Sequence, residues 1–189
     1  MDRRDMMKAL LAVGASSALV ACGEKAAPKS SGPSGDNFAK AGAFFSGREM
    51  AIIGALANTI IPDTDTPGAV AAGVPDVIQN LASEWATPDA RAGWRAVVDG
   101  VNSQLGEGGR GFAELPAEAQ NTALAAFDAA AYGDGATDLH KGYRDVKSTI
   151  ATAYYMSEVG ATQELRYEAV PGEWKGCIPF SDVGRTWAT

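Results

Sequence analysis

Apolar residues recur every three or four positions through most of the chain, which is the spacing of one face of an α-helix. Capping residues and prolines divide this pattern into five segments. Ser46 and Glu49 have the spacing of a capping box before the first segment. Pro75, Thr87 and Pro116 suit the starts of the next three. The apolar positions of the five segments are Ile53, Leu56, Ala57 and Ile60; Val77, Ile78, Leu81 and Trp85; Trp94, Val97, Val98, Val101 and Leu105; Leu124 and Phe127; and Leu139, Tyr143, Val146, Ile150 and Ala153.

These segments predict an all-α fold. None of them shows the alternation of apolar and polar residues that indicates a half-buried β-strand. We expect about five helices in a small bundle over residues 46–165, with Gly160 as the C-cap of the fifth helix. A length of 189 residues fits one such domain.

Residues 166–189 do not continue the helical pattern, because two prolines and three glycines interrupt them. The segment is nevertheless too apolar for a solvated tail, so it is predicted to be an irregular C-terminal interaction arm. The arm would pack either on the chain's own helices or on another subunit, since tryptophan, tyrosine and arginine are common interface anchors. Its large apolar residues are Tyr167, Trp174, Ile178, Phe180 and Trp187.

The first 21 residues have the order of parts of an export signal. The pair Arg3-Arg4 precedes thirteen uncharged residues, 9–21, a run shorter than the roughly 20 residues that span a bilayer. The double arginine resembles a twin-arginine signal, which exports proteins that are already folded. Residues 19–22, Leu-Val-Ala-Cys, resemble the lipoprotein box, in which the cysteine is acylated and becomes the mature N-terminus. An ordinary signal peptide with an incidental cysteine is the alternative.

Lipidation of Cys22 would place the mature protein in the periplasm, anchored by its acyl chains to the inner or the outer membrane. Residues 22–45 would then form a flexible tether, because residues 23–37 hold little that could be buried. An acylated Cys22 would also leave Cys177 without a partner for a disulfide within the chain.

Composition excludes several classes of function. The chain carries 16 Lys and Arg against 23 Asp and Glu, a formal net charge of -7, whereas nucleic-acid binding needs a basic surface. One His and two Cys exclude a His-rich metal site and a site with four thiolate ligands.

Two loops imitate functional motifs. Residues 106–111 match G-x-G-x-x-G, but they follow a helix and not a strand, so we interpret them as a loop between helices and not as a nucleotide site. Residues 63–68 resemble the start of an EF-hand loop, but its twelfth position is Val74 and the bidentate Glu is missing. A turn capped by aspartate is the better interpretation.

Two single residues are the remaining candidates for chemistry. His140 has no Ser or Cys motif near it, so we expect a surface or hydrogen-bonded histidine and not a catalytic base. Cys177 has no neighbouring histidine or basic cluster that would activate it, so we expect a buried structural thiol. The sequence therefore predicts no catalytic, cofactor-binding or metal-ligating residue in this chain.

Two blocks of the sequence resemble the gluconate 2-dehydrogenase subunit 3 family. The first comprises residues 60–62 (Ile-Ile-Pro), 65–69 (Asp-Thr-Pro-Gly-Ala) and 72–75 (Ala-Gly-Val-Pro). The second comprises residues 154–160 (Tyr-Tyr-Met-Ser-Glu-Val-Gly), and the resemblance extends over about residues 46–175.

The resemblance implies a non-catalytic partner of a large FAD-dependent subunit of the glucose-methanol-choline oxidoreductase type. That subunit would oxidise a sugar or a sugar acid and pass electrons to a cytochrome c subunit, which holds haem, or to another acceptor. The small subunit would help to export, stabilise and anchor the folded flavin subunit. FAD is therefore expected in the partner and not in this chain.

On this hypothesis the functional residues form an interface with the partner. The loop after residue 60, the end of the fifth helix and the C-terminal arm are the segments that we expect to form it. The predicted interface residues are Asp65, Pro67, Gly68, Tyr154, Tyr155, Trp174, Cys177, Phe180 and Trp187.

Two alternatives belong to other classes of protein. The first is a stand-alone helical lipoprotein of the periplasm that binds another protein or a small ligand. The second is an independent hydrolase that uses Asp63, Asp65 or Asp76 as a pair of carboxylates.

Overall fold

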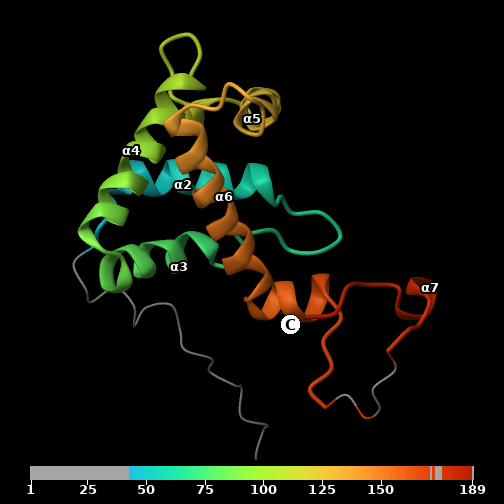
Figure 1. Ribbon diagram of the computed structural model, residues 1–189. Helices are drawn as coiled ribbons and strands as arrows, with labels where there is room; N and C mark the ends of the chain where they lie inside the picture. Colours follow the sequence, from blue (N-terminus) through green and yellow to red (C-terminus); the bar gives the residue numbers. More distant parts are fainter. Residues whose placement is uncertain (1–42, 171, 173–175, 189) are drawn as a thin grey trace, which may run out of the picture. The chain divides into compact units, whose positions relative to one another are not determined.

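The computed structural model describes residues 43–170, 172 and 176–188. Over these residues it contains five α-helices of seven or more residues and no β-strand, which confirms the predicted all-α class (Figure 1). The predicted export pair Arg3-Arg4, the predicted lipidation site Cys22 and the arm residue Trp174 lie outside the described residues.

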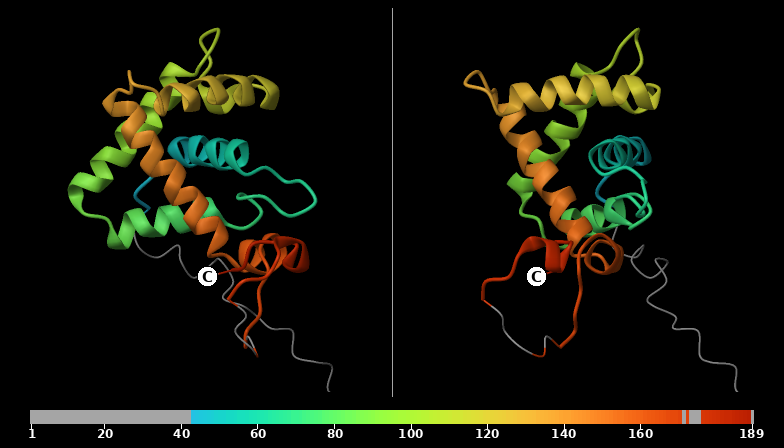
Figure 2. Two further views of the ribbon diagram at one scale, coloured as in Figure 1. Left: turned by 45° about the vertical axis from the view of Figure 1, so that its right-hand side comes forward. Right: turned by 90° about the vertical axis from the view of Figure 1, so that its right-hand side faces the viewer.

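Some of the described elements follow one another directly, as α3 and η2 do, whereas a long loop, residues 61–73, joins α2 to α3. Two of the helices are central: α2 contacts α3, α4 and α5, and α6 contacts the same three helices (Figures 1 and 2). In chain order the elements are α2 (Gly47–Ile60), α3 (Val74–Asn80), the π-helical turn η2 (Leu81–Trp85), α4 (Pro88–Gln104), the 3-10 turn η3 (Phe112–Glu114), α5 (Ala117–Ala131), α6 (Asp138–Tyr155), the π-helical turn η4 (Gly160–Glu164) and α7 (Phe180–Val183).

One apolar core lies between these helices. Most of the predicted inward positions are buried, because each helix turns its apolar stripe towards its neighbours. Trp85 and Val77 differ, with 79% and 41% of their surface exposed. The chain widens at η2, where Ala86 N–H bonds to Leu81 O, so the spacing of α3 does not carry Trp85 to the core. The largest fully buried side chains are Ile52, Ile53, Leu56, Val74, Val98, Val101, Phe112, Tyr143, Ile150 and Tyr154.

The fifth predicted helix ends earlier than the sequence indicated. α6 stops at Tyr155, and the hydroxyl of Ser157 donates to Tyr154 O (2.6 Å) and accepts from Gly160 N–H (3.0 Å). Gly160 is buried in η4, and a Cβ there would collide with the carbonyl oxygen of Tyr154. The prediction of Gly160 as a C-cap was therefore wrong, since this glycine allows a close backbone contact and has no positive φ angle.

The packed domain also begins earlier than residue 46. Phe45 is 2% exposed, stacks against Trp94 and exchanges two hydrogen bonds with the side-chain amide of Gln79 (2.9 and 3.2 Å). The guanidinium group of Arg95 lies 4.3 Å from the ring centre of Phe44. Because both phenylalanines pack against the helices, the predicted tether of residues 22–45 extends too far towards the domain.

Glu49 is a buried charge at the start of α2, with 7% of its surface exposed. Its carboxylate accepts hydrogen bonds from the backbone N–H and the hydroxyl of Ser46, both at 2.7 Å, and from Nε of Arg95 at 2.6 Å. Burial acts to raise the pKa of Glu49, but the hydrogen bonds from Ser46 and Arg95 outweigh it and hold the pKa below its usual value. The predicted capping box is confirmed. Its Glu49 also forms an ion pair with Arg95, which joins α2 to α4.

We predict that Glu49 makes the stability of the fold depend on pH. Because the folded-state pKa of Glu49 lies below that of the unfolded chain, its ionisation stabilises the fold above the unfolded pKa. This contribution is lost as the pH falls through the folded-state pKa. Urea unfolding at a series of pH values should show that Glu49→Gln is less stable than the wild type at neutral pH and that the difference shrinks in acid. A difference that does not vary with pH would contradict this role.

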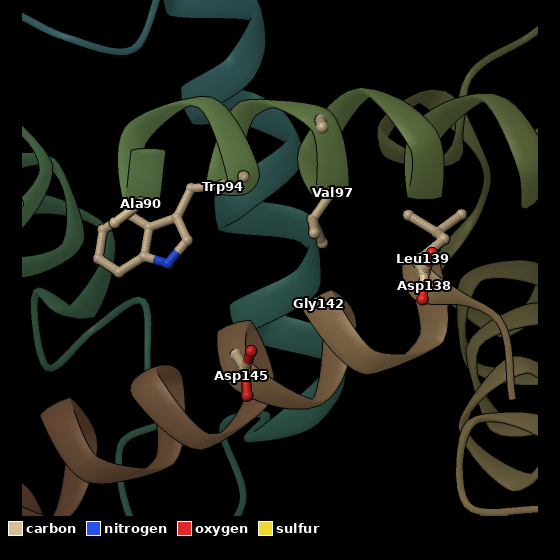
Figure 3. A pocket seen from close by; sticks show the side chains of 9 residues that line it. Ala90, Trp94, Val97, Asp138, Leu139, Gly142 and Asp145 are labelled. Atoms are coloured by element: carbon tan, nitrogen blue, oxygen red, sulfur yellow. The ribbon is translucent and has the colours of Figure 1, made fainter. Parts of the chain in front are cut away.

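Glycines set the separation of α4 and α6. A Cβ at Gly142 would lie 2.5 Å from Cγ2 of Val97, and one at Gly100 would lie 2.7 Å from Cδ1 of Leu139. Figure 3 shows Val97 projecting from α4 towards the point where α6 carries Gly142. The two helices therefore approach more closely than any larger residue would allow.

We predict that Gly142→Ala destabilises the fold by about 1–3 kcal/mol, the usual cost of overpacking a core. The neighbour is a β-branched valine, whose side chain has few alternative rotamers with which to make room. Gly93→Ala in α4 is the matched control, because a Cβ there meets nothing within 4 Å. The control should be neutral or stabilising by up to about 1 kcal/mol, since alanine favours helix. Equal midpoints of denaturant unfolding for both variants would contradict the packing argument.

Candidate partner interface

The two sequence blocks meet at one end of the domain. The hydroxyl of Tyr154, at the end of α6, donates to Pro67 O at 2.9 Å across 87 positions of sequence. A second bond links the same segments, from the hydroxyl of Thr66 to Oε2 of Glu164 at 2.6 Å. Residues 61–73, called the α2–α3 loop below, are thus attached to the end of α6 and to η4 (Figures 1 and 2).

The α2–α3 loop is also fixed internally. Asp63 Oδ1 accepts from Gly68 N–H at 2.5 Å, and Ala69 N–H bonds to Ile61 O at 2.9 Å. A Cβ at Gly68 would lie 2.5–2.6 Å from backbone atoms of residues 61–63, so only glycine fits. The interpretation of residues 63–68 as a turn capped by aspartate agrees with this geometry. The carboxylate of Asp63 is therefore committed to the loop.

Of the interface residues predicted in these two blocks, some are internal and some are exposed. Gly68 and Tyr154 are buried, and Pro67 is partly buried, so these three shape the loop. Asp65 and Tyr155 are exposed. The structure adds two apolar side chains that the sequence analysis did not single out, Val70 (47% exposed) and Met156 (79% exposed). The only sequence signal for them was their position, Met156 within the second block and Val70 between two parts of the first.

The arm is a segment that returns to its own start. Arg166 N–H bonds to Thr186 O and Ala188 N–H bonds to Arg166 O, both at 2.8 Å, which forms a parallel bridge between Arg166 and Trp187. The guanidinium group of Arg166 lies 4.3 Å from the ring centre of Trp187. Trp187 is 36% exposed, so the arm covers part of this ring itself.

Most other apolar side chains of the arm face solvent. Tyr167, Val170, Ile178 and Phe180 are 43–80% exposed. Cys177 is also exposed, so the expectation of a buried thiol was wrong. α7 has only four residues, and the chain around Cys177 forms bends and not a longer helix that could cover it.

The remaining candidate motifs have structural roles. Glu107 and Arg110 pair through two backbone hydrogen bonds, and Gly108 and Gly109 turn the chain with φ angles of 63° and 79°. Residues 106–111 are thus the loop between helices that the sequence predicted. Nδ1 of His140 accepts from Thr137 N–H at 3.1 Å, which makes it a hydrogen-bonded capping residue, as expected.

A polar cluster that the sequence analysis missed lies between α5 and α6. Asp128 Oδ1 accepts from the hydroxyl of Tyr143 (2.9 Å) and from Nζ of Lys147 (2.6 Å). Burial, followed by the hydrogen bond to Asp128, raises the pKa of Tyr143 far above its usual value. Because Tyr143 and Lys147 of α6 both donate to Asp128 of α5, the cluster joins the two helices.

A groove with a volume of about 520 Å³ lies beside the crossing of α4 and α6 (Figure 3). Its walls are mainly small or apolar, including Ala90, Gly93 and Leu139. Asp138 at its rim pairs with Lys141 (2.8 Å), and this hydrogen bond lowers the pKa of Asp138. Within the described part of the chain, no three His, Cys, Asp or Glu residues are grouped so that they could hold a metal ion.

The fold and this surface define a class of protein: a small helical domain with exposed apolar side chains on the α2–α3 loop, at the end of α6 and on the arm. The model of one family, gluconate 2-dehydrogenase subunit 3, matches residues 47–172. The chain belongs to this family, whose name denotes a subunit of a dehydrogenase complex. Comparisons with curated proteins and with solved structures gave no significant match.

Within the described part of the chain, no helix is both long enough and apolar enough to cross a bilayer.

We predict that Tyr154→Phe destabilises the fold by about 1–2 kcal/mol, because the carbonyl of Pro67 loses its hydrogen-bond donor. Tyr155→Phe is the matched control, since Tyr155 is 44% exposed and water can replace its hydroxyl contacts. Thermal unfolding followed by circular dichroism would measure both variants. Equal transition temperatures for the two would mean that the link between the loop and α6 contributes little.

Proposed function

We propose that this chain is the non-catalytic small subunit of a periplasmic FAD-dependent sugar or sugar-acid dehydrogenase. The observation that carries the proposal is the match of residues 47–172 to the gluconate 2-dehydrogenase subunit 3 family. The exposed apolar side chains at one end of the domain support it, since clusters of such side chains are typical of protein interfaces. The flavin and the active site belong to a large partner of the glucose-methanol-choline type, which passes electrons to a cytochrome c or another acceptor.

The same proposal assigns a role to the N-terminal sequence. FAD is held by a folded domain, so a flavin subunit has to receive it before export. A twin-arginine signal at Arg3-Arg4 exports folded proteins, and a small subunit that carries it can bring the loaded flavin subunit across the membrane. Acylation at Cys22 then keeps the assembly at the membrane, near the electron acceptor.

The partner surface comprises Asp65, Tyr155 and Phe180 of the predicted set, together with Met156. Trp187, also in the predicted set, closes the arm on Arg166. Tyr154, Pro67 and Gly68 act on this surface from within, because they hold the α2–α3 loop against α6. Trp174 and Cys177 complete the predicted set; Cys177 is exposed on the arm.

The proposal predicts that the affinity-tagged chain, purified in mild detergent from the membranes of its own host, brings with it a larger yellow subunit. Flavin absorbance and mass spectrometry of the eluate would identify that subunit. Phe180→Ser should reduce retention of the yellow subunit about tenfold or more, as expected for a central apolar anchor.

Trp85→Ser is the matched control, because Trp85 is 79% exposed but lies in η2, at the opposite end of α3 from the α2–α3 loop. This variant should retain the partner at the wild-type level. A colourless wild-type chain that elutes alone would refute the proposed function, whereas equal losses in both variants would refute only the location of the surface.

A further inference from the structure

We infer that Arg166 and Trp187 form a clasp that holds the C-terminal arm in its docking shape before the partner binds. The inference rests on the proposed function and names the residues that position its interface. Arg166 is a positioning residue in this scheme, since it acts on the partner through the shape of the arm.

The clasp joins the two ends of the arm by several independent contacts. Arg166 bonds through its backbone to Thr186 and Ala188, and its guanidinium group covers the ring of Trp187 at 4.3 Å. Nη1 of Arg166 also donates to Val183 O at 3.3 Å, at the end of α7. The side chain of Arg166 therefore contacts both Trp187 and the short helix that carries Phe180.

A further contact secures the arm to the domain. Nη1 of Arg185 donates to Gln163 O, which lies in η4. η4 is itself bonded to the α2–α3 loop through Glu164 and Thr66. The position of the arm is thus linked to the loop that forms the other part of the proposed partner surface.

Closure of this kind lowers the entropy cost of binding. An open arm would have to order its backbone when it docks, whereas a closed arm has already lost that freedom. The exposed side chains of Tyr167, Ile178 and Phe180 are then presented in one arrangement. Trp187 contributes mainly by closing the arm, because two thirds of its surface is already covered within the chain.

The chemistry of the arm fits a protein partner and not a lipid surface. The exposed charges of the described arm cancel, with Glu168 and Asp182 against Arg166 and Arg185, and the whole chain has a net charge of -7, so no excess of positive charge draws the arm to an anionic bilayer. Much of the arm also lies outside regular secondary structure, and the backbone N–H and C=O groups there cannot be satisfied in hydrocarbon. A folded protein surface offers partners for both kinds of group.

The experiment compares the affinity of the full chain and its variants for the yellow subunit. Arg166→Ala should raise the dissociation constant about tenfold, because the arm opens. Arg166→Lys should give an intermediate value, since lysine keeps the charge but loses the planar stack on the ring. Binding of Arg166→Ala at the wild-type level would overturn the inference.

A disulfide provides the decisive variant. Arg166 and Trp187 form a β-bridge, and residues paired in this way lie about 4.8 Å apart. This separation is within the span of about 4.4–6.8 Å between the Cα atoms of a disulfide. The double change Arg166→Cys with Trp187→Cys, made together with Cys177→Ser, replaces the clasp by a covalent bond. Its oxidised form should bind like Cys177→Ser alone, and its reduced form about tenfold more weakly.

Weak binding by both redox forms would overturn the inference, because Arg166 or Trp187 would then contact the partner directly. Vesicles of phosphatidylcholine and phosphatidylglycerol test the lipid alternative with Cys22→Ser, which removes the predicted anchor. If the Cys22→Ser chain binds these vesicles and the further change Arg166→Ala abolishes that binding, the inference would also be overturned. Failure of the wild-type chain to capture any yellow subunit would instead refute the proposed function on which the inference rests.

Discussion

The hydrogen bond from Tyr154 to Pro67 O is the constraint on which the proposed partner surface depends. It holds the α2–α3 loop on the last turn of α6, and the turn made by Ser157 and Gly160 then sends the chain into η4. Two residues of η4 accept further hydrogen bonds: Glu164 from the hydroxyl of Thr66 and Gln163 from the side chain of Arg185. The loop, the end of α6 and the start of the arm are therefore parts of one hydrogen-bonded assembly.

The glycines of the two sequence blocks serve this same assembly. Gly68 and Gly160 each occupy a place where a Cβ would strike backbone atoms, at the loop and at the turn after α6. The two blocks thus largely describe how two distant segments fit together. The residues available to a partner are exposed members of these blocks, such as Tyr155 and Met156.

The sequence predicted the helices well because capping and periodicity are local. Ser46 and Thr87 begin α2 and α4 as predicted, and the stripes of α4 and α6 are buried. It failed where the outcome depends on hydrogen bonds that leave the spacing of apolar residues unchanged. The π-helical turn that exposes Trp85 depends on the bond from Ala86 N–H to Leu81 O, and the end of α6 at Tyr155 is marked by the bonds of the Ser157 hydroxyl. The same holds for the clasp, because Arg166 and Trp187 meet only after the chain has reversed.

Phe45 has a mechanical consequence under the proposed anchoring of the chain at Cys22. Its main-chain N–H and C=O groups both bond to the side chain of Gln79 in α3, and its ring lies in the core against Trp94. Tension applied ahead of residue 44 therefore passes into α3 and α4 before it reaches the capping box of α2. The first helix is shielded from being peeled off turn by turn, and the domain resists a pull as one body.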